Sequence, residues 1–283
     1  MQKDFAERLK NVRLSKSERQ IATKLTQNLH KTAFLAGPQL AEECGVSPSS
    51  ITRFAQKLGY LGFPELKKEL EWLYRKTTTP YEMFESFLSK TAGESVPQLS
   101  IAQDIQNLVN LRESLNIDTL EAAVSRIDEA RIIYLAAIGS SEICVELLAS
   151  FLEALQKRYA KLTDHGISKK VELVEIVSSD VLIAFSFQRI LREVRDVALY
   201  AKEKGATAIA VTDSEFSPLA MACDLTLVAP VIGTTFGLSH VASIAMVNLI
   251  ANCLAARNPD KNLKILEKAK EQWNNLPIFC DTF

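Results

Sequence analysis

Between residues 131 and 257, short apolar runs alternate with longer helical patterns, and this alternation constrains the fold more than any other sequence feature. The helical patterns lie at 142–155, 191–204 and 240–256. The apolar runs, rich in β-branched and aromatic residues, lie at 131–139, 158–163, 180–187, 206–213 and 223–230. Near-continuous apolar strands interspersed with helices are typical of a parallel sheet covered on both faces. The sequence therefore predicts a flavodoxin-like, doubly wound α/β domain with five parallel strands, which fit an order such as 2-1-3-4-5.

Residues 1–76, by contrast, show only helical patterns, and their central stretch reads "LAEECGVSPSSITRFAQKLGY". Gly45 divides this stretch into two segments, because glycine provides a helix stop or a tight turn. Ser47 is expected as the N-cap of the second segment, with Pro48 at its first helical position. The apolar residues of the second segment form one face and are Ile51, Phe54, Ala55 and Leu58. Two helices joined in this way predict an all-α helix-turn-helix domain.

The opposite face of that second helix is polar and suits DNA. Hydroxyl groups bond phosphates or bases, Arg can grip guanine through two acceptors, and Gln can do the same for adenine. No acidic residue lies on this face, where a carboxylate would repel the duplex. The expected DNA-binding residues are Ser47, Ser49, Ser50, Thr52, Arg53, Gln56 and Lys57, with Lys67 and Lys68 of the next helix as backbone contacts. The alternative is an ordinary helical hairpin with a solvated polar face.

The charge distribution agrees with a DNA-binding N-terminal region. The chain of 283 residues has a net charge of −1, but residues 1–76 hold 14 Lys and Arg against 8 Asp and Glu. The remainder holds 19 against 26. A basic module joined to an acidic body suits one part that meets a phosphate backbone and one that does not.

Several protein classes are disfavoured by the composition. No run of about 18 apolar residues predicts a membrane helix, and the charged N-terminus lacks the apolar core of a signal peptide. The scattered cysteines show no metal-binding spacing and are Cys44, Cys144, Cys223, Cys253 and Cys280. We therefore expect a cytoplasmic protein with reduced cysteines, without a metal site, a cofactor or a membrane partner.

The motif "LAEECGVSPSSITRFAQKLGYLGFPELKKEL" resembles the signature of the RpiR family of bacterial transcriptional regulators. Members of that family carry a winged or extended helix-turn-helix ahead of a sugar isomerase (SIS) domain that binds phosphosugars. The resemblance implies a helix-turn-helix domain at 1–77, a helical linker at 78–117, a SIS domain at 118–257, and a C-terminal helix and tail at 258–283. It also implies a DNA operator and a phosphorylated sugar as partners, and a homodimer or homotetramer as the assembly.

Two segments resemble the phosphate-binding motifs of SIS domains. "AAIGSS" is similar to G-x-G-x-S, with Ala137 in place of the first Gly. "SFQRILRE" is similar to S-x-S-G-x-T-x-E, but Gln188, Arg189 and Leu191 replace Ser, Gly and Thr. Arginines here would either grip phosphate or be solvated helix residues. The expected ligand-binding residues are Gly139, Ser140, Ser141, Ser186, Gln188, Arg189, Arg192 and Thr235.

The residues leave two other functions open. A sugar-phosphate isomerase (aldose–ketose) needs a base that moves a proton between adjacent carbons, for which His165, His240 and Glu193 are candidates. No His/Glu pair lies at a recognisable spacing, so we expect no enzyme activity and no catalytic residue. A structural oligomerisation module that has lost its ligand is the third interpretation. The sequence favours a regulator whose operator binding is modulated by a phosphorylated sugar.

Overall fold

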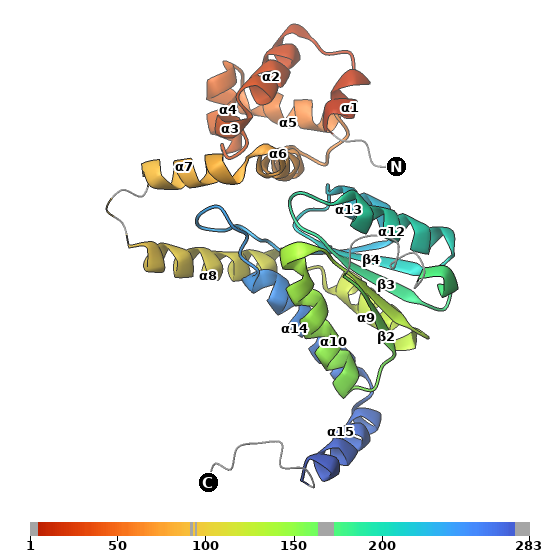
Figure 1. The fold of residues 1–283 in the computed structure, drawn as a ribbon. Helices are drawn as coiled ribbons and strands as arrows, with labels where there is room; N and C mark the ends of the chain where they lie inside the picture. The colour runs from red at the N-terminus through yellow and green to blue at the C-terminus, as the bar shows by residue number, and fades with distance from the viewer. Residues whose placement is uncertain (1–4, 91–92, 94, 164–172, 275–283) are drawn as a thin grey trace. The chain divides into compact units, whose positions relative to one another are not determined.

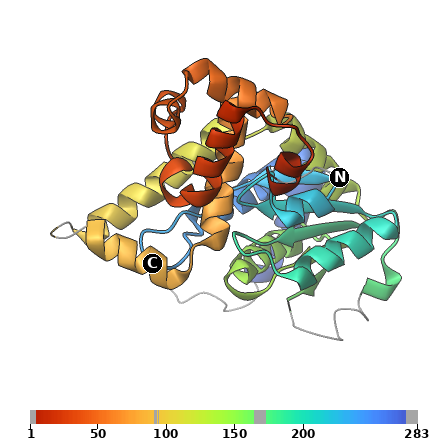
Figure 2. The same cartoon turned by 90° about the horizontal axis from the view of Figure 1, so that it is seen from above.

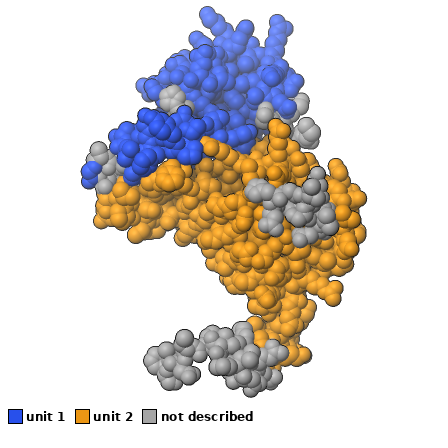
Figure 3. All heavy atoms as spheres, viewed as in Figure 1, with its two compact units in different colours: residues 1–93 blue, residues 94–283 orange. Residues whose placement is uncertain are grey.

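The computed structural model of the protein describes residues 5–90, 93, 95–163 and 173–274. The chain divides into two compact units, Met1–Gly93 and Glu94–Phe283 (Figure 3). The division falls inside the segment 78–117, which the sequence predicts to be a linker. Each unit has its own hydrophobic core and is described here by itself.

The first unit is built from helices. Ser15 and Glu18 form a capping box at the start of α2, in which each side chain bonds the other's backbone N–H. No strand occurs among the described residues of this unit, so its helix-turn-helix region has no β-wing there. The helices are α1 (Phe5–Lys10), α2 (Lys16–Gln27), α3 (Leu29–Thr32), α4 (Gly37–Cys44), α5 (Pro48–Lys57), α6 (Phe63–Thr77) and α7 (Pro80–Lys90).

A buried carboxylate on α6 bonds the start of α1 and the segment between α5 and α6. Glu69 on α6 is fully buried, and it accepts hydrogen bonds from the Phe5 backbone N–H at 2.6 Å and from the Tyr60 hydroxyl at 2.5 Å. Arg8 on α1 donates to the Leu58 carbonyl at 2.9 Å and lies over the Tyr60 ring. These bonds hold α1 against the segment that follows α5.

The second unit contains the predicted sheet. Its five strands are all parallel, in the order β2-β1-β3-β4-β5, which confirms the expected doubly wound topology. Ile133 of β1 pairs with Tyr159 of β2 on one side and with Val181 of β3 on the other. The strands are β1 (Ile133–Ala136), β2 (Tyr159–Leu162), β3 (Val181–Phe185), β4 (Thr207–Thr212) and β5 (Leu225–Val228).

Helices cover both faces of the sheet (Figure 1). Alternate strand residues such as Leu135 and Ile183 point into one core together with α9 (Ile117–Glu129), α10 (Glu142–Ala154) and α14 (Val241–Arg257). Their neighbours, such as Leu182 and Ala184, point into the second core with α12 (Arg192–Glu203) and α13 (Pro218–Ala222). The residues of the central strands β1 and β3 are all buried and apolar, because each of them lies under a helix on one face or the other.

The helical stretch between 96 and 129 is interrupted. It consists of α8 (Val96–Ser114) and α9, and the Asn116 side chain caps α9 by accepting from the Thr119 N–H at 2.9 Å. Asparagine is favoured at an N-cap because its side chain bonds an otherwise unpaired helix N–H. The break turns the chain from α8 into the helix that packs on the sheet.

The C-terminal part of the described chain is α15 (Pro259–Asn274), which follows α14. Within the described ranges, no single helix has the length and hydropathy to cross a membrane. The pair Val241–Arg257 and Pro259–Lys270 meets those criteria only jointly, across a bend of 102°.

Asp180, which directly precedes β3, is the buried charge on which the start of the sheet depends. Its side chain accepts from Arg131 at 2.7 and 3.0 Å, from the Ile132 N–H at 3.2 Å and from the Val177 N–H at 2.9 Å. We expect Asp180→Ala to lower the free energy of unfolding by about 2–3 kcal/mol, because buried donors lose a charged acceptor. Urea unfolding measures this loss.

Asp196→Ala is the matched control, because Asp196 pairs with Arg195 on an exposed surface. Exposed ion pairs contribute little, so we expect a change below about 0.5 kcal/mol. Equal losses in the two variants would contradict the role assigned to Asp180.

Candidate functional site

The turn between α4 and α5 has the geometry that a helix-turn-helix requires. Gly45 ends α4 in the left-handed conformation with φ of 64°, which glycine adopts without steric cost. The Val46 N–H donates to the Ala41 carbonyl at 2.9 Å and closes the helix end. Pro48 then starts α5 at its first turn, as the sequence predicts.

Helix α5 has one buried and one exposed face. Ile51, Phe54 and Ala55 are at most 1% exposed, and they attach the helix to the core of the first unit. The residues expected to meet DNA lie on the other side. Ser47, Ser49, Thr52, Arg53, Gln56 and Lys57 are exposed, and Ser50 is half-buried.

The serines at the start of α5 bond one another. The Ser47 hydroxyl forms no cap bond to the backbone, contrary to the expected side-chain N-cap. It lies 2.9 Å from the Ser49 hydroxyl and 2.8 Å from that of Ser50. Arg53 donates to the Ser50 hydroxyl at 3.4 Å. Three hydroxyls and one guanidinium therefore form a continuous polar end of the helix.

Two of the expected cationic contacts are paired within the unit. Lys57 bonds Glu18 of α2 at 2.6 Å, and Lys67 lies 4.0 Å from Glu71 on its own helix, whereas Lys68 is exposed. The Lys57 ammonium and the Ser15 N–H hold the pKa of Glu18 below its usual value. Although α5 itself carries no acid, a carboxylate from another helix thus partly neutralises its C-terminal end.

In the second unit, the turn after β1 carries the first predicted phosphate-binding segment. Gly139 has φ of 70°, Ser140 is exposed and Ser141 is buried at the entry to α10. The Gly139 N–H, which the resemblance offers to an anion, donates to the Glu142 carboxylate at 2.8 Å. A ligand anion would have to displace this side chain to reach that amide.

The turn after β3 carries the second segment. Ser186 and Gln188 are buried, whereas Arg189 and Arg192 are exposed. Gln188 has φ of 54°, a strained value for a residue with a side chain, and its N–H donates to Asp213 at 2.8 Å. The substituted segment is therefore an ordered turn tied to the end of β4.

The polar residues after β4 serve the turn and the following helix. Ser217 caps α13 by accepting from the Ala220 N–H at 3.0 Å, and it also accepts from Thr212 at 3.1 Å. Ser214 accepts from the Phe216 N–H. These bonds support the turn and the start of α13.

The long connection from β5 to α14, residues 230–240, lies against α8 (Figures 1 and 2). Asn107 donates to the Ile232 carbonyl at 2.8 Å, and Ser239 donates to Asp104 at 2.5 Å. A side chain at Gly233 would collide with the backbone of Gly237, so the loop folds back tightly on itself. Thr235 is half-buried within it.

His240 joins these turns at the carboxyl edge of the sheet. Its Nε2 lies 3.1 Å from the Ser140 hydroxyl, and its Nδ1 lies 3.0 Å from the Ser243 hydroxyl. The ring meets Phe187 edge-to-face, with centroids 5.7 Å apart. His240, which follows β5, therefore contacts residues that follow β1 and β3. The sequence offers His240 only as one of three candidate bases, and it does not reveal the contact with Ser140, which spans 100 positions.

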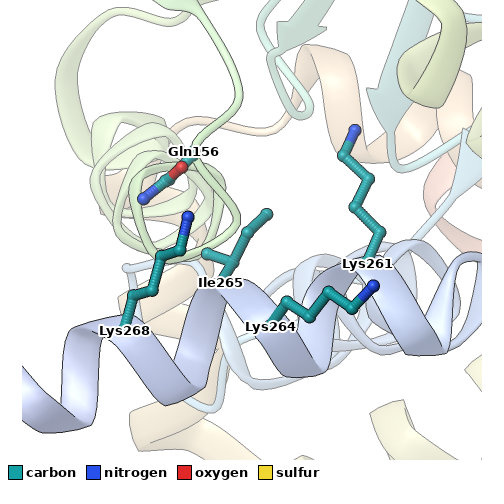
Figure 4. A pocket seen from close by; sticks show the side chains of 5 residues that line it. All are labelled: Gln156, Lys261, Lys264, Ile265 and Lys268. Atoms are coloured by element: carbon teal, nitrogen blue, oxygen red, sulfur yellow. The ribbon is translucent and has the colours of Figure 1, made fainter.

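A separate cavity of about 410 Å³ lies between α15 and the end of α10. Figure 4 shows Lys268 and Ile265 pointing toward Gln156, with Lys261 and Lys264 beside them. None of the predicted ligand-binding residues lines it. Of the other two candidate bases, Glu193 is exposed on α12 and His165 lies outside the described residues.

Family models match both parts of the chain. A helix-turn-helix domain of the rpiR family matches residues 6–77, and a SIS domain matches residues 126–253. An uncharacterized HTH-type transcriptional regulator of Haemophilus influenzae is 28% identical over 271 residues, which cover 89% of this chain and 92% of that protein.

Solved structures support the same architecture. The sugar isomerase domain of an RpiR transcription factor from Sphaerobacter thermophilus is 31% identical, with a TM-score of 0.60 over 62% of this chain and 98% of that one. The Vibrio vulnificus NanR protein, solved with ManNAc-6P, is 21% identical, with a TM-score of 0.58 over 93% and 95%. The fold and both domain matches thus define a helix-turn-helix regulator with a SIS domain. The chain belongs to the RpiR family of transcriptional regulators.

The ion pair between Lys57 and Glu18 predicts a pH-dependent contribution to stability. Because the pKa of Glu18 is lowered in the folded protein, the pair stabilises above the unfolded-state pKa and is lost as the pH falls through the folded value. Lys57→Met should therefore reduce the free energy of unfolding by less than about 1 kcal/mol at neutral pH. The difference from the wild type should vanish on acidification.

Urea unfolding followed through Trp72, in a Trp273→Phe background, measures this difference at several pH values. Lys68→Met is the control, because Lys68 is exposed on α6 and no ion pair is found for it among the described residues. A Lys57→Met deficit that persists at acid pH would mean that the lysine stabilises by packing alone.

Proposed function

We propose that this regulator binds its operator through the exposed face of α5 and that a phosphorylated sugar at the carboxyl edge of the sheet modulates this binding. The observation that carries the proposal is the division of α5 into a buried apolar face and an exposed face of hydroxyls, Arg53 and Gln56. That surface matches what the major groove accepts from a recognition helix.

The residues of α5 take different roles in this proposal. Arg53 and Gln56 read base edges, since their side chains form two hydrogen bonds to guanine and adenine, respectively. The hydroxyls of Ser47, Ser49, Ser50 and Thr52 contact phosphates or bases. Lys57, Lys67 and Lys68 contact the backbone, which positions the protein without specifying sequence. Because Lys57 and Lys67 are already paired, a DNA phosphate would have to displace Glu18 and Glu71 to reach these two lysines.

The phosphosugar site rests on the turns after β1 and β3. The NanR structure contains ManNAc-6P, and this chain has the same fold. We assign the phosphate to Ser140, Ser141 and Ser186, because hydroxyls donate to phosphate oxygens. Gly139, Gln188, Arg189, Arg192 and Thr235 complete the proposed lining. The exposed Arg189 and Arg192 supply positive charge. Arg189 lies where the family pattern has Gly, and Arg192 directly precedes the matching Glu193.

Regulation then follows from two arrangements of the DNA-binding units in a homodimer or homotetramer. Two recognition helices would reach half-sites one helical turn apart, about 34–36 Å. The sugar changes operator affinity only as far as it binds one arrangement better than the other. We assign no catalysis to the site, since the His240 ring is engaged by two serine hydroxyls and not by a carboxylate.

Arg53→Ala tests the DNA-reading role of α5. After an operator has been selected from a random duplex library, we expect the variant to bind it about 1–3 kcal/mol more weakly and to lose preference at one base pair. A mobility-shift titration at fixed salt measures both effects. Arg112→Ala, which removes an exposed arginine of the second unit, should leave both unchanged. Unaltered base preference in Arg53→Ala would contradict the assignment.

A thermal-shift screen tests the effector class. A ligand that binds only the folded protein raises its melting temperature, so at least one hexose or amino-sugar phosphate, ManNAc-6P among them, should do so. The same sugar without its phosphate should not. Ser186→Ala should weaken the effect, and the active compound should change operator affinity. A screen in which no phosphosugar acts would leave the oligomerisation module as the better interpretation of the SIS domain.

A further inference from the structure

The hydrogen bonds around His240 determine which of its nitrogens carries the proton. The Ser243 hydroxyl has one proton, which it donates to the His240 backbone carbonyl at 2.9 Å. Its oxygen is then an acceptor for the Nδ1 proton, 3.0 Å away. The neutral ring therefore carries its proton on Nδ1, and Nε2 has only a lone pair.

Ser140 must consequently donate its hydroxyl proton to Nε2 across the 3.1 Å contact. The oxygens of a fully ionised sugar phosphate accept hydrogen bonds and have no proton to donate. In this arrangement the exposed hydroxyl that should hold a phosphate presents only lone pairs to it. Two acceptors facing each other repel, so the neutral histidine opposes anion binding at Ser140.

Protonation of Nε2 reverses this arrangement. The imidazolium donates from both nitrogens, so Ser140 accepts from His240 and its own proton turns toward the phosphate. The cation also attracts the anion directly. No covalent bond between heavy atoms changes, and the single proton comes from solvent.

We propose that His240 is a positioning residue that takes up one proton when a phosphate group binds at Ser140, so that effector binding by this chain is linked to pH. This inference deepens the proposed function and rests on it.

The groups that surround the ring leave it neutral before a ligand arrives. Burial lowers the pKa of His240. Phe187 contributes an apolar edge from the β3 turn, and Ser243 lies on α14 itself. On α10, Cys144 is a neutral thiol whose pKa is raised by burial. Glu142 of the same helix is engaged by the Gly139 N–H, and on α8, Asp104 accepts from Ser239.

The sign of the pH dependence follows. A bound phosphate raises the pKa of His240, so affinity increases as the pH falls through the bound-state value and levels off below the ligand-free value. The gain is at most about tenfold per pH unit, because one proton is taken up. Protonation of the phosphate itself, near pH ~6, opposes the gain at lower pH.

Imidazole NMR titration of the full-length protein tests the proposal, with inorganic phosphate as the probe and sodium chloride at matched ionic strength as the reference. The chain has three histidines, and His240→Gln identifies the signals of His240. We expect its nitrogen shifts to report the Nδ1–H tautomer without phosphate. Phosphate should raise the pKa of this histidine and leave the other two unchanged.

Ser140→Ala is the second variant, since it retains His240 and removes the hydroxyl that links it to the anion. Phosphate should no longer move the His240 pKa in this protein. In His240→Gln, phosphate affinity should lose the part of its pH dependence that exceeds the titration of phosphate itself.

The outcomes separate the two proposals. If phosphate or a sugar phosphate raises the melting temperature but the His240 pKa stays constant, the proton link is wrong and the effector site stands. Equal shifts of all three histidines would indicate a general ionic effect and also overturn the link. If neither phosphate nor any phosphosugar stabilises the protein, both proposals fail.

Discussion

The common direction of the five strands is the constraint on which the second unit depends. Because β1, β3, β4 and β5 all run parallel, their carboxyl ends reach the same edge of the sheet. The serines proposed to hold the phosphate, Ser140, Ser141 and Ser186, follow two of those ends. Ligands bind at this edge in open α/β sheets because the strand ends leave room there for turns and helix N-termini.

The parallel arrangement gathers the turns, but other contacts hold them. The β5–α14 loop is anchored from outside the sheet by Asp104 and Asn107 of α8. Its last residue, His240, then reaches back to the turn after β1. Each of these bonds joins elements more than 90 positions apart in the chain, so the site exists only when the unit is folded.

In the first unit the decisive feature is the burial of one face of α5. Ile51 and Phe54 fix the helix in rotation, so the hydroxyls and Arg53 must face outward. Glu69 and Glu18 add long-range bonds, one to the α1 N-terminus and the other to Lys57. The second of these bonds uses a charge that α5 alone would offer to DNA. The charge that α5 presents to DNA therefore depends also on α2, whose Glu18 pairs with Lys57 at its end.

Local patterns in the sequence were sufficient for most of the architecture. The alternation of apolar runs and helices predicted the five parallel strands, because strand burial on both faces leaves a direct mark on composition. Helical periodicity likewise predicted the buried face of α5, and Gly45 the turn before it. Tertiary contacts alone decided the rest: Lys57 is paired with Glu18, and His240 contacts Ser140. These contacts depend on distances between segments remote in the chain, which no local pattern records.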